Sequence, residues 1–360
     1  MATNKRKSGM TRVGLAVGFA ALCLAALLMG LRMEVPARAA GTGIGLVIDG
    51  ASLDQGFNLL SYQGLQRAET ELGVVGTVYT TPSYLDYAPQ LQQCVDDGNT
   101  LCISVGFAMG GAISSTAKAN PTVDFAIVDY SWDAYLDNLR GMTFAEDEAG
   151  YLAGTLAGLM TQSDVVGAVG GMPVPAVVRY VEGYRNGAQC VNADVTVLIS
   201  YTTSFVDPDQ GAQVAQAMIG HAADLIFTAG GPTGDGGLLT ATQSGVWGIG
   251  VDADQYTTLF MSGTVAGSDK LLSSAMKRVD NAVFSTISDT VHSAFTSGTV
   301  EYDLAQQGVG LAPFHETDPF VLQSVRDTLA QVEQGIVQGM IDVNNTCRNR
   351  VYLPTVMKNP

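Results

Sequence analysis

The sequence predicts an α/β fold of two doubly wound parallel-sheet lobes joined by a hinge. Short apolar runs rich in β-branched residues alternate with helix-length segments, and these runs are continuous rather than alternating apolar with polar. Continuous apolar strands indicate parallel sheets that are covered on both faces, and repeated βα units imply right-handed crossovers. The alternation pauses once near residue 161 and then resumes, which indicates a second lobe.

Eight strands are predicted from the apolar runs, at residues 43–48, 74–79, 101–105, 123–128, 165–169, 195–201, 225–228 and 246–251. Helical patterns lie between them, at residues 58–72, 88–97, 148–160, 176–190, 210–221 and 236–244. Further along, we expect a helix over 273–287 that returns the chain to the first lobe, and a helical stretch with a Gly-rich turn over 316–345.

The pattern also predicts how the chain is divided. The first lobe takes residues 41–160 plus about 272–302, the second takes 161–271 plus about 303–345, and 346–360 form a C-terminal tail. Several crossovers between two such lobes place a cleft between the carboxyl ends of their strands, where open α/β sheets bind ligands.

The first 40 residues are interpreted as a signal peptide. Four basic residues precede an apolar run over 13–29, and Ala37-Arg38-Ala39 has the small-residue pattern that a signal peptidase cuts. We expect cleavage near Ala39 and an exported, extracytoplasmic protein. An uncleaved membrane anchor is the alternative, since the run is just long enough to span a bilayer. A lipid anchor at Cys23 is disfavoured by the bulky Leu22 before it.

The chain is acidic, with a formal net charge of −16. Removing residues 1–40 removes six basic residues and one acid, which leaves 12 Lys and Arg against 33 Asp and Glu. Such a surface repels nucleic acid and anionic lipid, so we expect neither as a partner. The acidity also has a simpler explanation, which is that it keeps an exported protein in solution.

Four cysteines remain after residue 40. Cys94 and Cys102 flank a short loop between a helix end and a strand and could form a local disulfide, and Cys190 with Cys347 could fix the C-terminal tail. The alternative is four buried thiols. No Cys-x-x-Cys occurs and the three histidines are scattered, so we expect no metal and no cofactor.

Residues that can bind a ligand follow the predicted strands. Asp49, Asp129 and Asp252 end or directly follow predicted strands. The turn after Asp49 carries Phe57 and Asn58, and turns after strands of the second lobe carry Phe205 and a Gly-rich loop around Gly231. Each has a plainer interpretation. Asp54 and Asp207 are expected to cap helices, the two Phe could belong to the core, and the Gly-rich loop could be a flexible turn.

The combination favours a planar, hydroxylated ligand. Two aromatic rings can sandwich a flat molecule, and carboxylates accept hydrogen bonds from sugar hydroxyls or exocyclic N–H groups. A lysine such as Lys277 can donate to ring oxygens and partly neutralise the nearby acids. Such a site suits neutral polyols and nucleosides and suits phosphates poorly.

The sequence resembles the basic membrane protein (BMP) family, the purine-nucleoside receptor-like substrate-binding proteins of ABC transporters, which have a type I periplasmic-binding-protein fold. The matching stretches run in the family's order from residue 43 to about 283: GLVIDGASLDQGFNLLSYQGL, ISVGFAMG, FAIVDY, FAEDEAGYLAG, VGAVGGMPVP, SFVDPDQG, FTAGGPTGDG, GVDADQ and SSAMKRVDNAV. FAEDEAGYLAG is expected to form a structural helix that leads to a crossover rather than a contact surface.

The resemblance implies roles for residues that would contact a base. Phe57 and Phe205 would stack on its two faces. Asn58 and Asp129 would bond its edge atoms, with Asp49 supporting them.

The resemblance also implies a ribose site. Asp252, Lys277 and a backbone N–H near Gly231 would hold the ribose hydroxyls. Pro232 interrupts the family's usual Gly-Gly-Thr-Gly loop, and the segment after residue 255 is longer than usual, which leaves Lys270 as an alternative to Lys277.

We therefore expect a monomeric extracytoplasmic receptor that closes its lobes around a nucleoside, with a purine nucleoside as the expected ligand, and presents it to an ABC transporter permease. A sensory binding protein for a sugar-like or other ring-bearing solute is one alternative. A nucleoside-hydrolysing enzyme is another, but no nucleophile with an adjacent base stands out, so we expect no enzyme and no catalytic residues.

Overall fold

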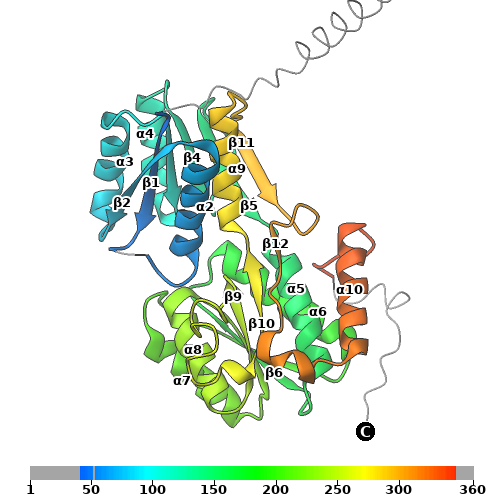
Figure 1. Ribbon diagram of the computed structural model, residues 1–360. Coiled ribbons are helices and arrows are strands. Elements are labelled where there is room, and N and C mark those ends of the chain that lie inside the picture. The colour runs from blue at the N-terminus through cyan, green and yellow to red at the C-terminus, as the bar shows by residue number, and fades with distance from the viewer. Residues whose placement is uncertain (1–40, 52, 346–360) are drawn as a thin grey trace, which may run out of the picture. The chain divides into compact units, whose positions relative to one another are not determined.

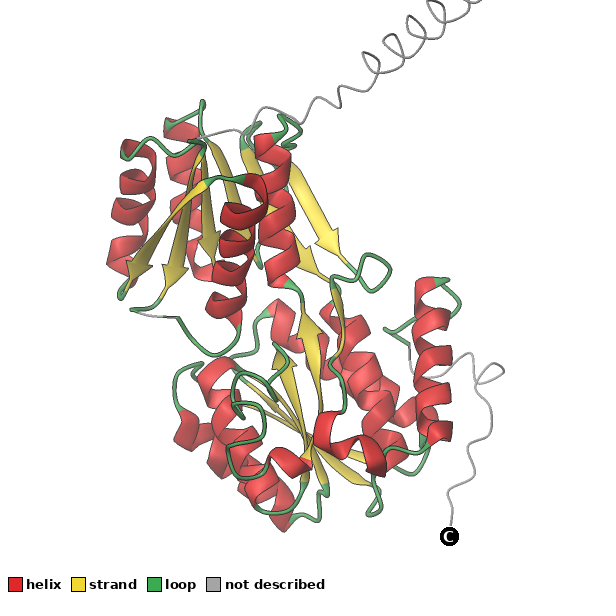
Figure 2. Cartoon of the chain, viewed as in Figure 1, coloured by secondary structure: helices red, strands yellow, loops and turns green. Residues whose placement is uncertain are grey.

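The computed structural model describes residues 41–51 and 53–345, which form two α/β lobes around two six-stranded sheets (Figures 1 and 2). The strand order is β11-β5-β4-β3-β1-β2 in the first sheet and β12-β10-β9-β8-β6-β7 in the second. The predicted fold class is thereby confirmed. The predicted signal peptide and C-terminal tail lie outside the described residues.

All neighbouring strands of the first sheet are parallel. The strands are β1 (Gly43–Asp49), β2 (Val75–Thr81), β3 (Leu101–Val105), β4 (Asp124–Val128), β5 (Leu139–Phe144) and β11 (Gly298–Tyr302). The helices around it are α2 (Phe57–Leu72), α3 (Tyr87–Asp96), α4 (Gly110–Ala119) and α9 (Val279–Val291).

Both faces of the first sheet are covered, as the continuous apolar strands predict. Along β1, Leu46 and Ile48 pack in the core cluster that includes Leu60 of α2, whereas Val47 packs in a second cluster with Leu91 of α3. Successive strand residues point to opposite faces, so a strand buried on both sides needs apolar residues at every position.

The second sheet is parallel except at its edge, where β12 (Val309–Leu311) runs antiparallel to β10 (Leu271–Lys277). Its other strands are β6 (Val165–Gly170), β7 (Thr196–Tyr201), β8 (Leu225–Ala229) and β9 (Trp247–Asp252). The helices that follow or flank these strands are α5 (Glu146–Met160), α6 (Pro175–Val191), α7 (Pro208–Gly220), α8 (Gly231–Gln243) and α10 (Gln323–Val337).

The helix predicted over residues 273–287 is wrong for its first residues, 273–277. Residues Leu271–Lys277 form β10, which pairs with β9 in the second sheet, and the helix α9 begins only at Val279. Pairing with a buried neighbour strand overrides the helical pattern of this segment. Three other strands, β5, β11 and β12, were not predicted. The lobe boundaries read from the sequence stay a prediction.

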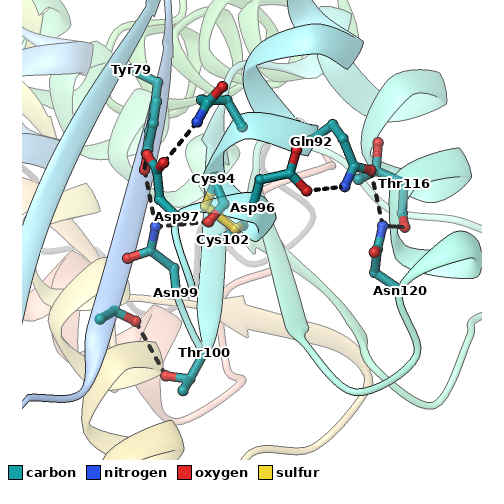
Figure 3. Close-up of a disulfide and its surroundings, with 12 residues drawn as sticks. Tyr79, Gln92, Cys94, Asp96, Asp97, Asn99, Thr100, Cys102, Thr116 and Asn120 are labelled. Atoms are coloured by element: carbon teal, nitrogen blue, oxygen red, sulfur yellow. Dashed lines mark hydrogen bonds between the residues drawn. A yellow bond between two sulfur atoms is a disulfide. The ribbon is translucent and has the colours of Figure 1, made fainter.

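The disulfide predicted between Cys94 and Cys102 is confirmed; it joins the end of α3 to β3 with the Cα atoms 6.2 Å apart (Figure 3). Beside it, the Tyr79 hydroxyl donates to Asp97, and Asn99 donates to the Tyr79 hydroxyl and the Cys94 carbonyl. The other predicted pair includes Cys347, which lies outside the described residues.

The chain passes between the sheets three times, from β5 to α5, from β10 to α9, and from β11 to β12. Backbone groups tie these connections together. Ala145 N–H donates to the Tyr302 carbonyl and Arg278 N–H donates to the Gly308 carbonyl, at 3.1 and 2.8 Å. The connections therefore form one hydrogen-bonded hinge. Within the described part of the chain, no helix has both the length and the apolar character needed to cross a membrane.

Candidate ligand-binding site

The predicted site residues all lie at or just beyond the carboxyl ends of strands, or at the helix that follows. Asp49, Asp252 and Lys277 are the last residues of β1, β9 and β10. The others are Asp129 directly after β4, Phe57 and Asn58 at the start of α2, Phe205 between β7 and α7, and Gly231 at the start of α8.

The turn before α2 is held by Asp54. Its carboxylate accepts hydrogen bonds from the backbone N–H groups of Gly56, Asn58 and Leu59, at 2.9, 2.9 and 3.2 Å. Asp54 therefore caps the helix start, as expected from the sequence. This cap fixes Phe57 and Asn58 in the first helical turn.

The Asn58 amide links this turn to β1. Its Nδ2 donates to the Asp49 carbonyl at 3.0 Å, while its Oδ1 is buried and has no hydrogen-bond partner. A buried amide oxygen without a donor is unusual in proteins and is the kind of group that a ligand N–H can satisfy. The Asp49 carboxylate itself accepts from the Tyr87 hydroxyl at 2.8 Å.

Lys277 lies at the centre of a buried ion network that joins the two lobes. Its Nζ is 2.6 Å from the Asp129 carboxylate after β4 and 2.9 Å from Glu146 at the start of α5. The same ammonium lies 5.3 Å from the ring centroid of Phe57. Glu146 is fully buried and also pairs with Arg179 of α6 at 2.6 Å.

The alternative lysine lies elsewhere. Lys270 Nζ is 4.6 Å from the ring centroid of Trp247, at the start of β9. Of the two lysines, it is therefore Lys277 that contacts Asp129 and Phe57.

Burial and neighbouring charges set the ionisation of this network. Burial works to lower the pKa of Lys277, but Asp129, Glu146 and Asp252 outweigh it and raise that pKa. Burial works to raise the pKa of Glu146, but Lys277 and Arg179 outweigh it and lower that pKa. Burial raises the pKa of Asp129, and Lys277 opposes this only in part.

Asp252 is a second acid of different character. Burial raises its pKa to about 7, opposed by Lys277 and reinforced by the charges of Asp129 and Asp54. A Cβ placed on Gly56 would lie 3.9 Å from the Cβ of Asp252, so the end of β9 lies beside the turn before α2.

Asp129 and Asp252 share an uncommon backbone. Both are non-glycine residues with positive φ, at 64° and 62°. Such conformations cost free energy and gather at functional sites.

Phe205 lies with different neighbours. Its ring meets the ring of Phe107 edge-on with centroids 6.4 Å apart, and its carbonyl accepts from Thr233 N–H of α8 at 3.1 Å. Gly231, with φ of 55°, opens α8 beside it. That Phe57 and Phe205 face each other stays a prediction.

Two further details concern these helix starts. Asp207 caps α7 by accepting from Gln210 N–H at 3.1 Å, as expected from the sequence. Pro232 lies in the first turn of α8, where a proline costs no helical hydrogen bond.

Sequence reasoning missed three residues around this site. Phe107 follows β3 by two residues, in the stretch ISVGFAMG, and its place after a strand was the available signal. Glu146 and Arg179 gave a weaker signal. Glu146 belongs to an acidic run at a helix start, which is typical of a favourable helix-dipole interaction. Among residues 41–51 and 53–345, no cluster of His, Cys, Asp and Glu is suited to hold a metal ion.

Two parallel-sheet lobes with polar and aromatic residues at their strand ends define the class of two-lobed solute-binding proteins. Within that class, the family model for the "ABC transporter substrate-binding protein PnrA-like" proteins matches residues 42–346. The chain belongs to this family, as the resemblance to basic membrane proteins predicted. It is thus a substrate-binding protein of an ABC transporter. Members of this family are extracytoplasmic binding proteins and not enzymes.

Relatives of similar length agree with this assignment, and a solved structure shares the fold. The chain is 33% identical to the "ABC transporter nucleoside-binding protein BmpA" of Lactococcus lactis, over 81% of this chain and 85% of that protein. It is 33% identical to the "CD4+ T-cell-stimulating antigen" of Listeria innocua, over 81% and 84%. An ABC solute-binding protein from Aeropyrum pernix shares the fold, with a TM-score of 0.74, 24% identity and coverage of 83% and 92%.

Proposed function

We propose that this protein binds a nucleoside, preferentially a purine nucleoside, outside the cytoplasm and delivers it to an ABC transporter permease. The observation that carries the proposal is the group formed by Lys277, Asp129 and Phe57, with Asp252 close to the same turn. It combines an aromatic surface with charged donors and acceptors, which a flat base attached to a hydroxylated sugar requires.

Each part of the ligand has a partner in this proposal. Phe57 and Phe205 stack on the base, while Asn58 Oδ1 and the Asp129 carboxylate accept from N–H groups at its edge, with Asp49 in support. The buried Asn58 Oδ1, which has no donor in the protein, supports a contact with a ligand N–H.

The sugar is assigned to the second lobe. Asp252 accepts from ribose hydroxyls, Lys277 donates to them, and a backbone N–H near Gly231 adds a third contact. Carboxylate acceptors make the stronger hydrogen bonds to hydroxyl donors, which favours a free sugar ring over a phosphate group.

Closure of the lobes around the ligand is part of the proposal. The site residues come from both sheets, and the Lys277–Asp129 ion pair joins them directly. A ligand that contacts both lobes favours the closed arrangement by its differential affinity, and a permease can then distinguish the loaded monomer from the empty one.

A calorimetric and thermal-shift screen tests the proposal. Inosine, guanosine and adenosine should raise the melting temperature most, a pyrimidine nucleoside less, and free ribose or a nucleoside monophosphate little, because tight ligands stabilise the folded state by mass action. Sugars raising the melting temperature while nucleosides do not would favour the sensory or sugar-binding alternative. Release of free hypoxanthine from inosine would instead reveal a hydrolase.

A further inference from the structure

The buried ammonium of Lys277 needs acidic or polar groups around it to remain charged. It is 2% exposed, and a buried ammonium is costly unless it is paired and hydrogen-bonded. Its four-carbon stem can also place the charge in several directions. The groups that surround Nζ therefore decide where the ammonium points.

Of its two carboxylate partners, Asp129 is the one that a ligand would engage. It follows β4 of the first sheet, and its side chain retains 12% exposure. Glu146 is completely buried at the start of α5, so a ligand cannot replace it. When a ligand takes up the Asp129 carboxylate, Glu146 is the partner that remains for Lys277.

Glu146 is itself held in place by α6. Its Oε2 accepts from Arg179 Nε at 2.6 Å, and Arg179 is partly exposed. The backbones of α5 and α6 are in direct contact here. A Cβ on Gly150 of α5 would collide with the carbonyl of Tyr180, the residue after Arg179. The spacing between Glu146 and Arg179 is thus fixed by close helix packing.

A second close contact is made by a glycine of the other helix. A Cβ on Gly183 of α6 would collide with the carbonyl of Asp147, the residue after Glu146. Glycines on both helices therefore bring the Glu146 and Arg179 backbones together. This arrangement leaves little freedom for the carboxylate that faces Lys277.

We propose that Glu146, fixed by Arg179, is a positioning residue that keeps the Lys277 ammonium directed at the ligand's hydroxyls after the ligand has taken Asp129. The inference rests on the proposed function, because it assigns a role within the nucleoside site. It predicts that Glu146 contributes to discrimination between hydroxylated and dehydroxylated sugars without contacting the ligand.

A purely structural role for Glu146 predicts something different. If the residue only stabilises the hinge, its loss weakens all ligands by a similar factor. The ratio between the affinities for inosine and 2′,3′-dideoxyinosine separates the two roles, because only the first has the ribose hydroxyls that Lys277 would bind.

The experiment measures both affinities by calorimetry in wild type, Glu146→Gln and Arg179→Gln. The ratio should fall about fivefold or more in Glu146→Gln, as expected for a misdirected hydrogen bond of about 1 kcal/mol. Arg179→Gln should lower the ratio less, since Glu146 keeps its charge. Glu182→Gln is the matched control: it removes an ion pair with Arg185 on the surface of α6 and should leave the ratio unchanged.

Circular dichroism and thermal unfolding identify the folded variants. If Glu146→Gln does not fold, Arg179→Gln decides alone, because its side chain is 39% exposed and tolerates replacement better. An unchanged ratio in the folded variants, with wild type binding inosine, overturns the inference and leaves the proposed function intact. A wild type that binds no nucleoside at all overturns the proposed function itself.

Discussion

The two acids that the sequence placed at the strand ends of opposite lobes, Asp129 and Asp252, differ in how their charge is balanced. Asp129 forms a close ion pair with Lys277, at 2.6 Å. Burial raises the pKa of both acids, and for Asp252, which the same lysine affects only at longer range, it raises the pKa to about 7. One part of the site thus depends on a fixed ion pair, while the other contains an acid that titrates near neutral pH.

The ion network should be the part most sensitive to mutation. Lys277→Met leaves Asp129 and Glu146 buried without their shared cation. Removing one partner of a buried ion pair lowers the free energy of unfolding by about 3–5 kcal/mol. We expect urea unfolding at pH 7.5 to show a loss of this size, and calorimetry to show no measurable nucleoside binding. A stable variant that still binds would contradict the central place given to Lys277.

Loss of the ring beside this network should have a smaller effect. Phe57→Ala removes one stacking surface, worth about 1–3 kcal/mol per base in stacking sites, so affinity should fall about 5- to 150-fold. Phe57→Tyr keeps the ring and should retain most of the affinity. Equal affinities for wild type and Phe57→Ala would remove Phe57 from the site.

Asp252 should make both stability and binding depend on pH. Its pKa is raised in the folded protein, so its contribution to stability is complete below the unfolded pKa and is lost as pH rises through about 7. Hydroxyl donors favour the ionised acid, so nucleoside affinity should rise with pH, up to about tenfold per unit below pH 7, and then level off.

The change Asp252→Asn should flatten both profiles between about pH 5.5 and 7.5 and should stabilise the ligand-free protein at pH 8. The measurements are urea unfolding and calorimetry across this range. Asp235, whose pKa burial raises to about 6, stays in place and accounts for any slope that remains at lower pH. Profiles of Asp252→Asn that match wild type would show that another group titrates.

The smallest effect is expected at the alternative lysine. Lys270→Met removes a cation–π contact with Trp247 at a partly exposed position, worth about 0.5–1 kcal/mol. Its nucleoside affinity should equal that of wild type within error in calorimetry. A clear loss of binding would instead bring Lys270 into the site.

Local patterns were sufficient where one segment decides its own structure. The βα alternation, the Cys94–Cys102 disulfide and the capping roles of Asp54 and Asp207 all depend on neighbouring residues, and each was predicted correctly. The error at residues 273–277 arose because β10 is a strand by virtue of its pairing with β9, a contact that local patterns do not encode.

The amino-acid sequence by itself determined the fold class, the family and the set of strand-end residues, because periodicity, turn chemistry and motifs are local properties of the chain. The tertiary structure alone decided that Lys277 rather than Lys270 meets Asp129, that Glu146 and Arg179 complete this network, and that Phe107 lies against Phe205. These contacts join residues up to 148 positions apart, so their charges and rings act on one another only once the two sheets are assembled.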